Sequence, residues 1–344
     1  MLHLMTLVVR YISCFIFLLS CSNDNTKLYS IYGKTQGTFY SVKYFSSQKV
    51  VSKANIDSVL LDIDLSLSSY IDFSTISRIN NNNTNKVDVF LKKVINRSLQ
   101  ICHETNGAFD ISIAPVVNAY GFGSKTKDIK TDTLNLSNYV GCDKIFIRDN
   151  LITKQDKNIE IDINGIAQGF SVDILSDFLK QQGIFDFIIN IGGEVFCSGT
   201  KKGKPWLVAI EKPFKNIQLQ KYILKLSNKA LATSGSYRKT KKLEGQIISH
   251  TMSPKSLKPV DNNLISVSIM SDNCMDADAY ATACMSMGLE SSKQFVKEKG
   301  IEACFIYKDK KDTLTYMTSG LLKLVSSDSA DFLDLQSSLG VAPQ

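Results

Sequence analysis

The sequence predicts a single large mixed α+β domain, in which helices pack on one sizeable sheet system. Short segments with the alternating pattern of strands and longer segments with the apolar spacing of helices are interspersed along the chain. Its 344 residues, 44% of them hydrophobic, can bury a large core. No linker long enough to separate two folding units follows the N-terminal region, so one mixed domain is favoured.

Strand patterns occur throughout the chain. Residues 40–45 alternate in polarity, and the apolar run 187–191 reads as a buried strand. Ile145–Arg148 and Asn158–Ile163 are predicted to pair as a hairpin. Further strands are predicted at Trp206–Ile210, Lys221–Leu226 and Leu264–Met270.

Helical spacing is found in four longer segments. Apolar residues recur at helical intervals in 54–67 and 87–105. The segment 167–182 is strongly amphipathic, and Gly183 stands where a helix C-cap is expected. The segment 276–287 is rich in Ala and Met and predicts a fourth helix.

Composition and charge exclude several classes of protein. The net charge of +7 comes from 40 Lys and Arg against 33 Asp and Glu, interleaved along the chain, which is unlike a polycation that grips nucleic acid. With 19 Gly and 6 Pro the chain is neither collagen-like nor a Pro-rich disordered protein. Its single apolar run lies at the N-terminus, which excludes a polytopic membrane protein.

The N-terminus carries the features of an export signal. Residues 1–20 contain a short apolar run, and Leu18-Leu-Ser-Cys21 resembles a bacterial lipobox, in which cleavage precedes a lipidated Cys. Cys21 is therefore the predicted lipidation site, and residues 21–30 are predicted to form a tether. An ordinary signal peptide or an uncleaved anchor with an incidental Cys is the alternative.

The eight cysteines do not form a recognisable framework. Beyond Cys14 and Cys21 they are scattered without a CxxC pair, and several lie in apolar runs. Buried free thiols are therefore predicted rather than disulfides or a zinc site.

A turn between a strand and a helix is the first segment with chemical potential. In Asp162-Ile-Asn-Gly165-Ile-Ala-Gln168-Gly169, a carboxylate is followed by a Gly-bearing turn and a helix start, where backbone N–H groups suit an anion. The alternative is that Asp162 simply caps the helix.

Two oxygen-bearing residues share one helix face in the second segment. Asp278 and Thr282 are four residues apart and offer two hard ligands of the kind that Mg²⁺ takes. The alternative is a helix N-terminus decorated with acids, which the helix dipole favours.

Two further segments are weaker. Small hydroxyl residues surround Gly235 in 232–238 and allow close approach of a ligand, although a simple β-turn explains them equally. His250 is a candidate general base because imidazole titrates near neutral pH, although a lone His at a strand end is more often structural.

Taken in order, these segments resemble the FAD:protein FMN transferases, the ApbE family. The blocks that carry the resemblance are Gly33–Thr38, Ser66–Tyr70, Ile76–Asn80, Gly107–Pro115, Tyr120–Gly123, Asp162–Gly169, Asn190–Glu194, Ala232–Gly235, His250–Pro254 and Ala277–Thr282. They span residues 31–310, and a lipobox upstream is also common in that family. Each block alone is weakly specific for the family. The presence of this many blocks in the same order is strongly specific.

The resemblance implies an ApbE-like fold over 31–320, followed by a C-terminal extension at 321–344. It implies an enzyme that cuts FAD at its pyrophosphate and moves FMN onto a Ser or Thr hydroxyl of a partner protein, while AMP leaves. By the same resemblance the partner would be a redox-pump or reductase subunit with a short motif around the accepting residue.

The resemblance also implies which residues form the site. FAD, the substrate, would contact Gln36, Tyr70, Ala108, Phe109, Asp110, Asp162, Gln168 and Met252. Mg²⁺ would be held by Asp278, Thr282 and the backbone oxygen of Gly165, with Ala281 at the same helical turn. His250 matches the histidine proposed as base in the family, so His250 and Asp278 are the predicted catalytic residues.

Three positions depart from the family pattern. Ser253 stands where Asp is usual, Leu257 where Gly is common, and Gln168 where Lys or Glu is frequent. The loop after His250 is therefore expected to have a different shape, while the proposed metal ligands are retained.

Two other functions compete with transfer. The chain could bind FAD without transferring it, or hydrolyse FAD to FMN and AMP. Retention of His250, Asp278 and Thr282 favours an enzyme. The expected location is the cell membrane, with the lipid-anchored domain facing the periplasm and no role in nucleic-acid binding.

Overall fold

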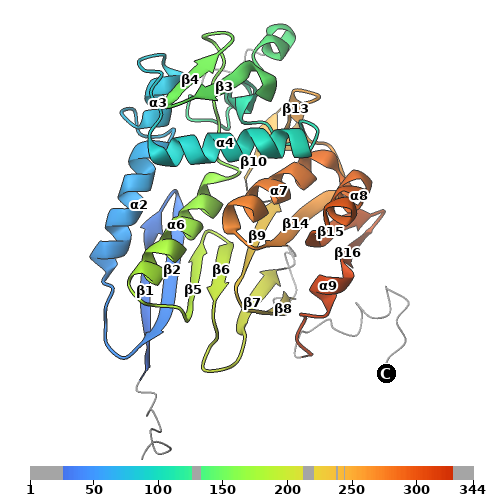
Figure 1. Ribbon diagram of the computed structural model, residues 1–344. Coiled ribbons are helices and arrows are strands. Elements are labelled where there is room, and N and C mark those ends of the chain that lie inside the picture. Colours follow the sequence, from blue (N-terminus) through green and yellow to red (C-terminus); the bar gives the residue numbers. More distant parts are fainter. Residues whose placement is uncertain (1–25, 126–132, 212–220, 238, 244, 328–344) are drawn as a thin grey trace, which may run out of the picture.

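The computed structural model describes residues 26–125, 133–211, 221–237, 239–243 and 245–327, and it confirms the predicted α+β fold (Figure 1). An eight-stranded sheet runs through the domain in the order β1-β2-β5-β6-β9-β14-β15-β16, and every neighbouring pair is antiparallel. Its strands are β1 (Lys27–Thr35), β2 (Thr38–Ser46), β5 (Phe187–Ile191), β6 (Glu194–Ser198), β9 (Lys229–Gly235), β14 (Leu264–Ser271), β15 (Glu302–Asp309) and β16 (Asp312–Met317). Cys21 and the predicted signal peptide lie outside the described residues.

Helices cover one face of this sheet. They are α2 (Lys53–Leu67), α6 (Ala167–Gln181), α7 (Cys274–Met287) and α8 (Leu289–Lys299). The main core lies between them and the sheet, where Tyr40, Tyr44 and Phe170 are buried. Within the described ranges, no helix is long and apolar enough to span a bilayer.

A two-stranded sheet covers the other face. It pairs β7 (Trp206–Glu211) with β8 (Lys221–Leu226), and the short helix α9 (Ser319–Leu322) packs beside it. Leu321 and Val325 are buried in the same cluster, and Val325 forms a bridge to Leu224. The packed domain therefore continues beyond residue 320, into the segment predicted to be an extension.

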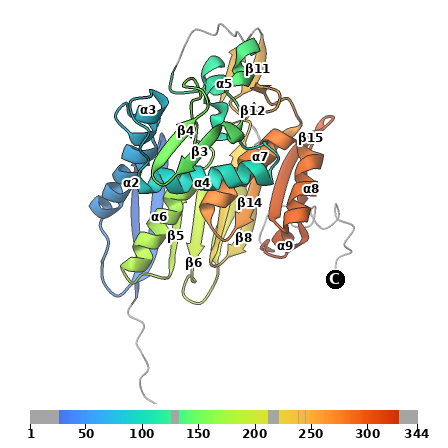
Figure 2. The same cartoon turned by 45° about the horizontal axis from the view of Figure 1, so that its top comes forward.

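A third layer lies above one end of the sheet (Figure 2). It contains α3 (Thr75–Asn80), α4 (Val89–Glu104), α5 (Ala114–Ala119), the 3₁₀ turns Ile111–Ile113, Thr133–Asn138 and Cys142–Lys144, and three hairpins. The hairpins are β3 (Ile145–Arg148) with β4 (Leu151–Lys154), β10 (Thr240–Leu243) with β11 (Gln246–Ser249), and β12 (Met252–Ser253) with β13 (Lys258–Pro259).

The ends of two predicted helices show how local chemistry sets their bounds. After α6, Gly183 adopts φ 74°, the left-handed conformation expected at a C-cap glycine. Helix α7 begins two residues before the predicted Asp276, because the Asn273 side chain accepts from the Asp276 N–H and caps the helix.

The predicted pairing of Ile145–Arg148 with Asn158–Ile163 is wrong. β3 pairs with β4 instead, through a two-residue turn in which Asp149 has φ 56°. Asn80 holds the 158–163 segment, since its amide nitrogen donates to the Ile161 carbonyl (2.9 Å) and its oxygen accepts from the Ile161 N–H (2.8 Å). A side chain thus takes the place of a strand partner, which apolar alternation does not reveal.

The prediction of free thiols is correct for four cysteines and wrong for two. Cys197, Cys274, Cys284 and Cys304 are buried thiols that are not disulfide-bonded. Cys102, at the end of α4, forms a disulfide with Cys142 across a sequence separation of 40. Neither position belongs to a spacing pattern, so the pair arises from the fold that brings the two segments together.

We expect the disulfide to contribute measurably to stability. Closing a 40-residue loop restricts the unfolded chain by about 4 kcal/mol in the chain-entropy estimate. Reduction should therefore lower the midpoint of thermal unfolding, measured by circular dichroism. The Cys102→Ser/Cys142→Ser double variant should unfold at the lower temperature and be insensitive to reductant. Equal unfolding temperatures with and without reductant would contradict the assignment.

Candidate active site

The centre of the candidate site is the crossing of α6 and α7. The Gly169 N–H of α6 donates to the Asp278 carboxylate of α7 at 3.0 Å. A Cβ at Gly169 would lie 2.3 Å from the Cys274 carbonyl oxygen, so only glycine permits this approach. The crossing brings together two segments that the sequence analysis selected separately.

Three oxygen-bearing residues gather beside this crossing. A Cβ on Gly165 would lie 2.9 Å from the Thr282 hydroxyl, so the backbone of Gly165 packs directly against Thr282. The hydroxyls of Ser234 and Thr282 are 3.2 Å apart. The 162–169, 232–235 and 277–282 blocks therefore meet at one place. Ala281 is fully buried in α7 and offers no side-chain donor atom, so its inclusion in the ligand set rests on the resemblance alone.

The β1–β2 turn reaches the same place. Gln36, at φ 49°, donates its amide to the Ser171 hydroxyl (2.8 Å) and to Asp64 (3.2 Å). Gln168 donates to the Gln36 carbonyl at 3.5 Å. Both predicted FAD contacts therefore lie together at the N-terminal end of α6.

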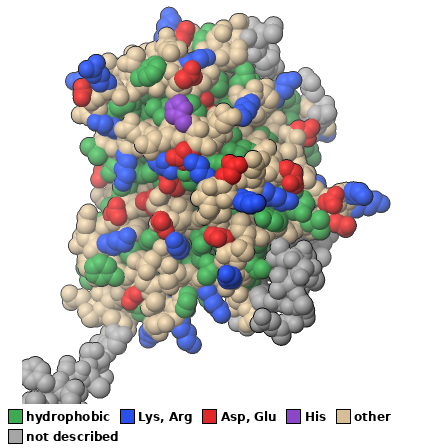
Figure 3. Space-filling model, turned by 45° about the vertical axis from the view of Figure 1, so that its right-hand side comes forward, with side chains coloured by type: hydrophobic (Ala, Val, Ile, Leu, Met, Phe, Trp, Pro, Cys, Tyr) green, Lys and Arg blue, Asp and Glu red, His purple; other side chains and the backbone are tan. Residues whose placement is uncertain are grey.

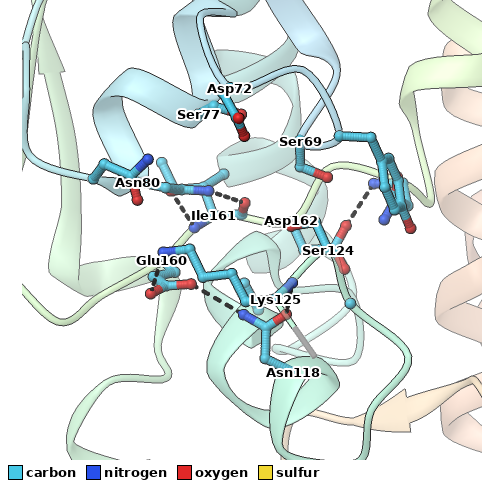
Figure 4. A pocket seen from close by; sticks show the side chains of 15 residues that line it. Ser69, Asp72, Ser77, Asn80, Asn118, Ser124, Lys125, Glu160, Ile161 and Asp162 are labelled. Atoms are coloured by element: carbon cyan, nitrogen blue, oxygen red, sulfur yellow. Dashed lines mark hydrogen bonds and ion pairs between the residues drawn. The ribbon is translucent and has the colours of Figure 1, made fainter. Parts of the chain in front are cut away.

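A polar cavity of about 160 Å³ opens next to Asp162 (Figure 4). It contains two predicted FAD contacts, Tyr70 and Asp162, and the Tyr70 ring is 62% exposed. On its wall Lys125 is paired with Glu160 at 2.8 Å, and Asn118 donates to the same carboxylate. Figure 4 shows Asn118 of α5, Lys125 and the 160–162 segment around this cavity, together with Ser77 and Asn80 of α3.

Asp162 stabilises the turn rather than the helix. Its carboxylate accepts from the Asn164 N–H at 2.8 Å, and the N-cap of α6 is Ile166, without a side-chain cap. The helix-cap alternative is therefore not observed. Burial raises the pKa of Asp162, and Lys239 partly opposes that shift.

A second cavity, of about 380 Å³, lies between the end of α4, the 253–255 loop and α8. Of the predicted FAD contacts it contains Ala108, and Ser253 on its wall follows Met252. Met252 itself is buried in a small apolar cluster with Val116 and Tyr120 of the α5 segment. Three of the eight predicted FAD contacts thus line the two cavities and two lie at the α6 end, whereas Phe109, Asp110 and Met252 line neither cavity.

The loop between Ala108 and Ser112 is firmly held. Phe109 is buried in the main core. Burial raises the pKa of Asp110, whose carboxylate accepts from the Ser112 N–H (2.8 Å) and hydroxyl (2.6 Å). The Asp110 carboxylate and the Cys102 and Cys142 sulfurs lie within 4.8 Å of one another, so the disulfide fixes this loop.

His250 follows β11, in the layer above one end of the sheet. Its backbone N–H donates to the Lys239 carbonyl at 3.1 Å, and its Nδ1 lies 3.2 Å from the same oxygen. Its ring centroid is 6.4 Å from that of Phe122. The hairpin therefore places His250 near Lys239, whose charge acts on Asp162.

The loop after His250 holds one residue in a left-handed conformation. Leu257, which stands where Gly is common in the family, has φ 56°, a conformation that favours glycine and strains other residues. The loop is closed by the Leu257 N–H donating to the Ser253 carbonyl at 2.8 Å.

Two buried carboxylates surround the N-terminal turns of α7. Burial raises the pKa of Asp278 to about 7, although the Gly169 N–H opposes the shift, and nearby Asp173 raises it further. Asp173 accepts from the N–H groups of Cys274 (2.7 Å) and Met275 (2.9 Å), and burial raises its own pKa to about 6. Asp173 was missed in the sequence, although its spacing of four from Gly169 places it on the α6 face that meets α7.

Arg97 of α4 was also missed. Its guanidinium binds both oxygens of Asp276 (2.7 and 3.1 Å) and contacts Glu104 and Tyr280. Asp276 and Tyr280 lie on the opposite side of α7 from Asp278 and Thr282, because the two pairs are offset by half a turn. Arg97 thus binds the side of α7 that faces away from Asp278 and Thr282. No short-range sequence pattern indicates this contact.

The donor atoms gathered here fit a magnesium ion. A buried carboxylate, a hydroxyl and a nearby backbone segment supply hard oxygens, and one or two carboxylates are typical for Mg²⁺. A divalent cation would also favour the charged form of Asp278, which burial otherwise disfavours.

A buried carboxylate with hydroxyl groups beside it forms the kind of site that phosphoryl-transfer enzymes use. The model of the ApbE family matches residues 36–305, and this chain belongs to that family. The resemblance inferred from the motifs is thereby confirmed.

Named relatives cover most of the chain. The FAD:protein FMN transferase of Vibrio cholerae is 30% identical over 86% of this chain and 92% of its own length. The enzyme of the same name from Haemophilus influenzae is 29% identical over 90% of this chain and 95% of its own.

Solved structures share the fold. The flavin transferase ApbE of Vibrio cholerae superposes with a TM-score of 0.79 at 28% identity, covering 87% of this chain and 99% of its own. The apo flavinyl transferase ApbE of Pseudomonas stutzeri gives 0.78 at 27% identity, covering 87% and 97%.

We expect Asp278 to destabilise the metal-free protein as pH rises. Its folded-state pKa of about 7 exceeds the ordinary value of 3.8, so the protonated form is favoured by folding. Its contribution is complete below pH 4 and is lost as pH rises towards 7 and above. In EDTA, Asp278→Asn should therefore raise the unfolding temperature at pH 8 by at least about 2 °C, and by less at pH 5.

Added Mg²⁺ should stabilise the wild type at pH 8 and leave Asp278→Asn unchanged. Asp309→Asn, which alters an exposed carboxylate, is the matched control and should follow the wild type. An Asp278→Asn variant that is less stable than the wild type in EDTA at pH 8 would contradict the argument.

Proposed function

We propose that this protein is a Mg²⁺-dependent FAD:protein FMN transferase. The observation that carries the proposal is the packing of Gly165 and Thr282 beside buried Asp278, in a chain of the ApbE family. The names of its relatives support the reaction. The oxygen atoms of Asp278, Thr282 and Gly165 support the binding of Mg²⁺.

The two cavities suit the two halves of FAD. The exposed ring of Tyr70 offers a stacking surface for the flavin beside Asp162. The cavity at Ala108 is then left for adenosine. Asp278, Thr282 and Gly165 would hold the Mg²⁺ that the pyrophosphate requires. Mg²⁺ bound there would neutralise the pyrophosphate charge.

The reaction needs one proton acceptor besides this charge neutralisation. The acceptor hydroxyl oxygen bonds to the FMN phosphorus, the bond from that phosphorus to the bridging oxygen breaks, and AMP leaves. His250 takes the hydroxyl proton. The acceptor would be a Ser or Thr of a redox-pump or reductase subunit.

The His250→Ala variant distinguishes a role of His250 as the base from a role in FAD binding. Because a base acts only when the hydroxyl attacks, FAD affinity should stay within a few-fold while transfer falls about 10²–10⁴-fold. FAD binding is measured by flavin fluorescence quenching, and transfer by in-gel fluorescence of an acceptor protein. His103→Ala, at an exposed position on α4, is the matched control and should keep full activity.

The products distinguish the rival functions. AMP with flavinylated acceptor supports the transferase. AMP with free FMN would assign a hydrolase, and intact FAD in the presence of Mg²⁺ would assign a binding protein. Full transfer by a folded His250→Ala variant would remove His250 from the mechanism.

We also propose that the protein is a lipoprotein anchored at Cys21 and faces the periplasm. The lipobox supports the anchor. The Cys102–Cys142 disulfide supports an oxidising compartment, because such bonds persist mainly in exported proteins.

Cys21→Ser should remove the lipid and with it stable membrane association, since two or three acyl chains are needed for lasting anchoring. The expected result is a protein that is released into the soluble fraction or accumulates as unprocessed precursor, detected by fractionation and intact mass. Normal processing with unchanged membrane association would argue against the lipobox. Cys197→Ser, at a buried free thiol, provides the control for processing.

A further inference from the structure

One end of the domain combines exposed lysines with exposed apolar side chains. The chain enters β1 at Lys27 on this end, and the register of β1, β2, β5 and β6 places three connections beside it. These are the segments between β2 and α2, between α6 and β5, and between β6 and β7 (Figure 1). We call this surface the lysine end.

The lysine end carries a clear excess of positive charge. Its exposed lysines are Lys27, Lys49, Lys180, Lys201, Lys202 and Lys204. Lys53 is also there, but it is paired with Asp57. Asp177, Asp186 and Asp272 also lie at this end. Asp186 already accepts from the Thr200 N–H at 2.6 Å, and Asp272 is paired with Lys229. Figure 3 shows blue side chains along this lower edge of the molecule.

Apolar side chains stand among these lysines. Phe185 is 63% exposed, Leu28 46% and Val50 41%. Long cationic side chains around exposed apolar groups are typical of surfaces that rest at the boundary between lipid headgroups and acyl chains.

We propose that the lysine end is a docking surface for an anionic lipid bilayer. The proposal rests on the anchor at Cys21 for its biological setting. Five residues separate Cys21 from Lys27, so an extended chain reaches at most about 20 Å from the anchor to β1. An anchor this short brings this end of the domain to the membrane before any other, and the charge of the lysines matches anionic headgroups.

The test uses the mature chain from residue 21 with Cys21→Ser, so that no acyl chain contributes to binding. The signal peptide is outside the described fold, which begins with β1. Sedimentation with vesicles of phosphatidylglycerol and phosphatidylcholine should show binding that pure phosphatidylcholine vesicles lack and that added salt weakens.

A triple variant identifies the surface. Lys201→Gln/Lys202→Gln/Lys204→Gln should weaken binding to the anionic vesicles at least about 10-fold. The matched control replaces three exposed lysines of the β15–β16 turn at the opposite end, Lys308→Gln/Lys310→Gln/Lys311→Gln, and should bind like the parent chain. Phe185→Ser should weaken binding independently of salt.

Equal binding to neutral and anionic vesicles, or equal losses in the two triple variants, would overturn the proposal. Self-association that the Lys201/Lys202/Lys204 variant abolishes, seen by sedimentation velocity, would instead assign the surface to a second copy of the chain. FMN transfer to a soluble acceptor should be unchanged in both triple variants, so failure of the transferase proposal is distinguishable from failure of this one.

Discussion

The close approach of α6 to α7 is the constraint on which the rest of the site depends. It exists because residue 169 has no side chain, which lets its N–H reach Asp278 and lets Asp173 accept from the first N–H groups of α7. Two carboxylates are thereby buried within one crossing. Such burial is unfavourable for charged groups without a compensating cation, so the crossing favours an occupied site over an empty one.

The contacts around α7 explain how this helix is held in place beside two carboxylates. Its ligand-bearing side faces the site, while Arg97 grips Asp276 from α4 on the other side. The disulfide ties the end of the same α4 to the segment after Val140, next to the Asp110 loop. Helix α4 therefore links α7, which carries Asp278 and Thr282, to the loop expected to contact FAD.

The sequence predicted the parts of this structure that depend on local pattern. Strands β2, β5 and β14 of the large sheet, the helix end at Gly183 and the Asp278–Thr282 face all follow from periodicity and capping. The sequence-based prediction failed where contacts between residues far apart in the chain determine the structure. The 158–163 segment looked like a strand but is held by the Asn80 side chain, and Cys102 and Cys142 meet only because the fold brings them together. Arg97 and Asp173 were missed for the same reason.

Strand β1 has a consequence for where acceptor proteins can be modified. Its nine residues run from the lysine end to the turn that holds Gln36, a rise of about 30 Å. With the lysine end resting on lipid, the transfer site would stand at that fixed height above the bilayer. Suitable acceptors are then those whose hydroxyl is presented at a similar height, and their encounter with the enzyme becomes a search within a thin layer along the membrane instead of through the whole compartment.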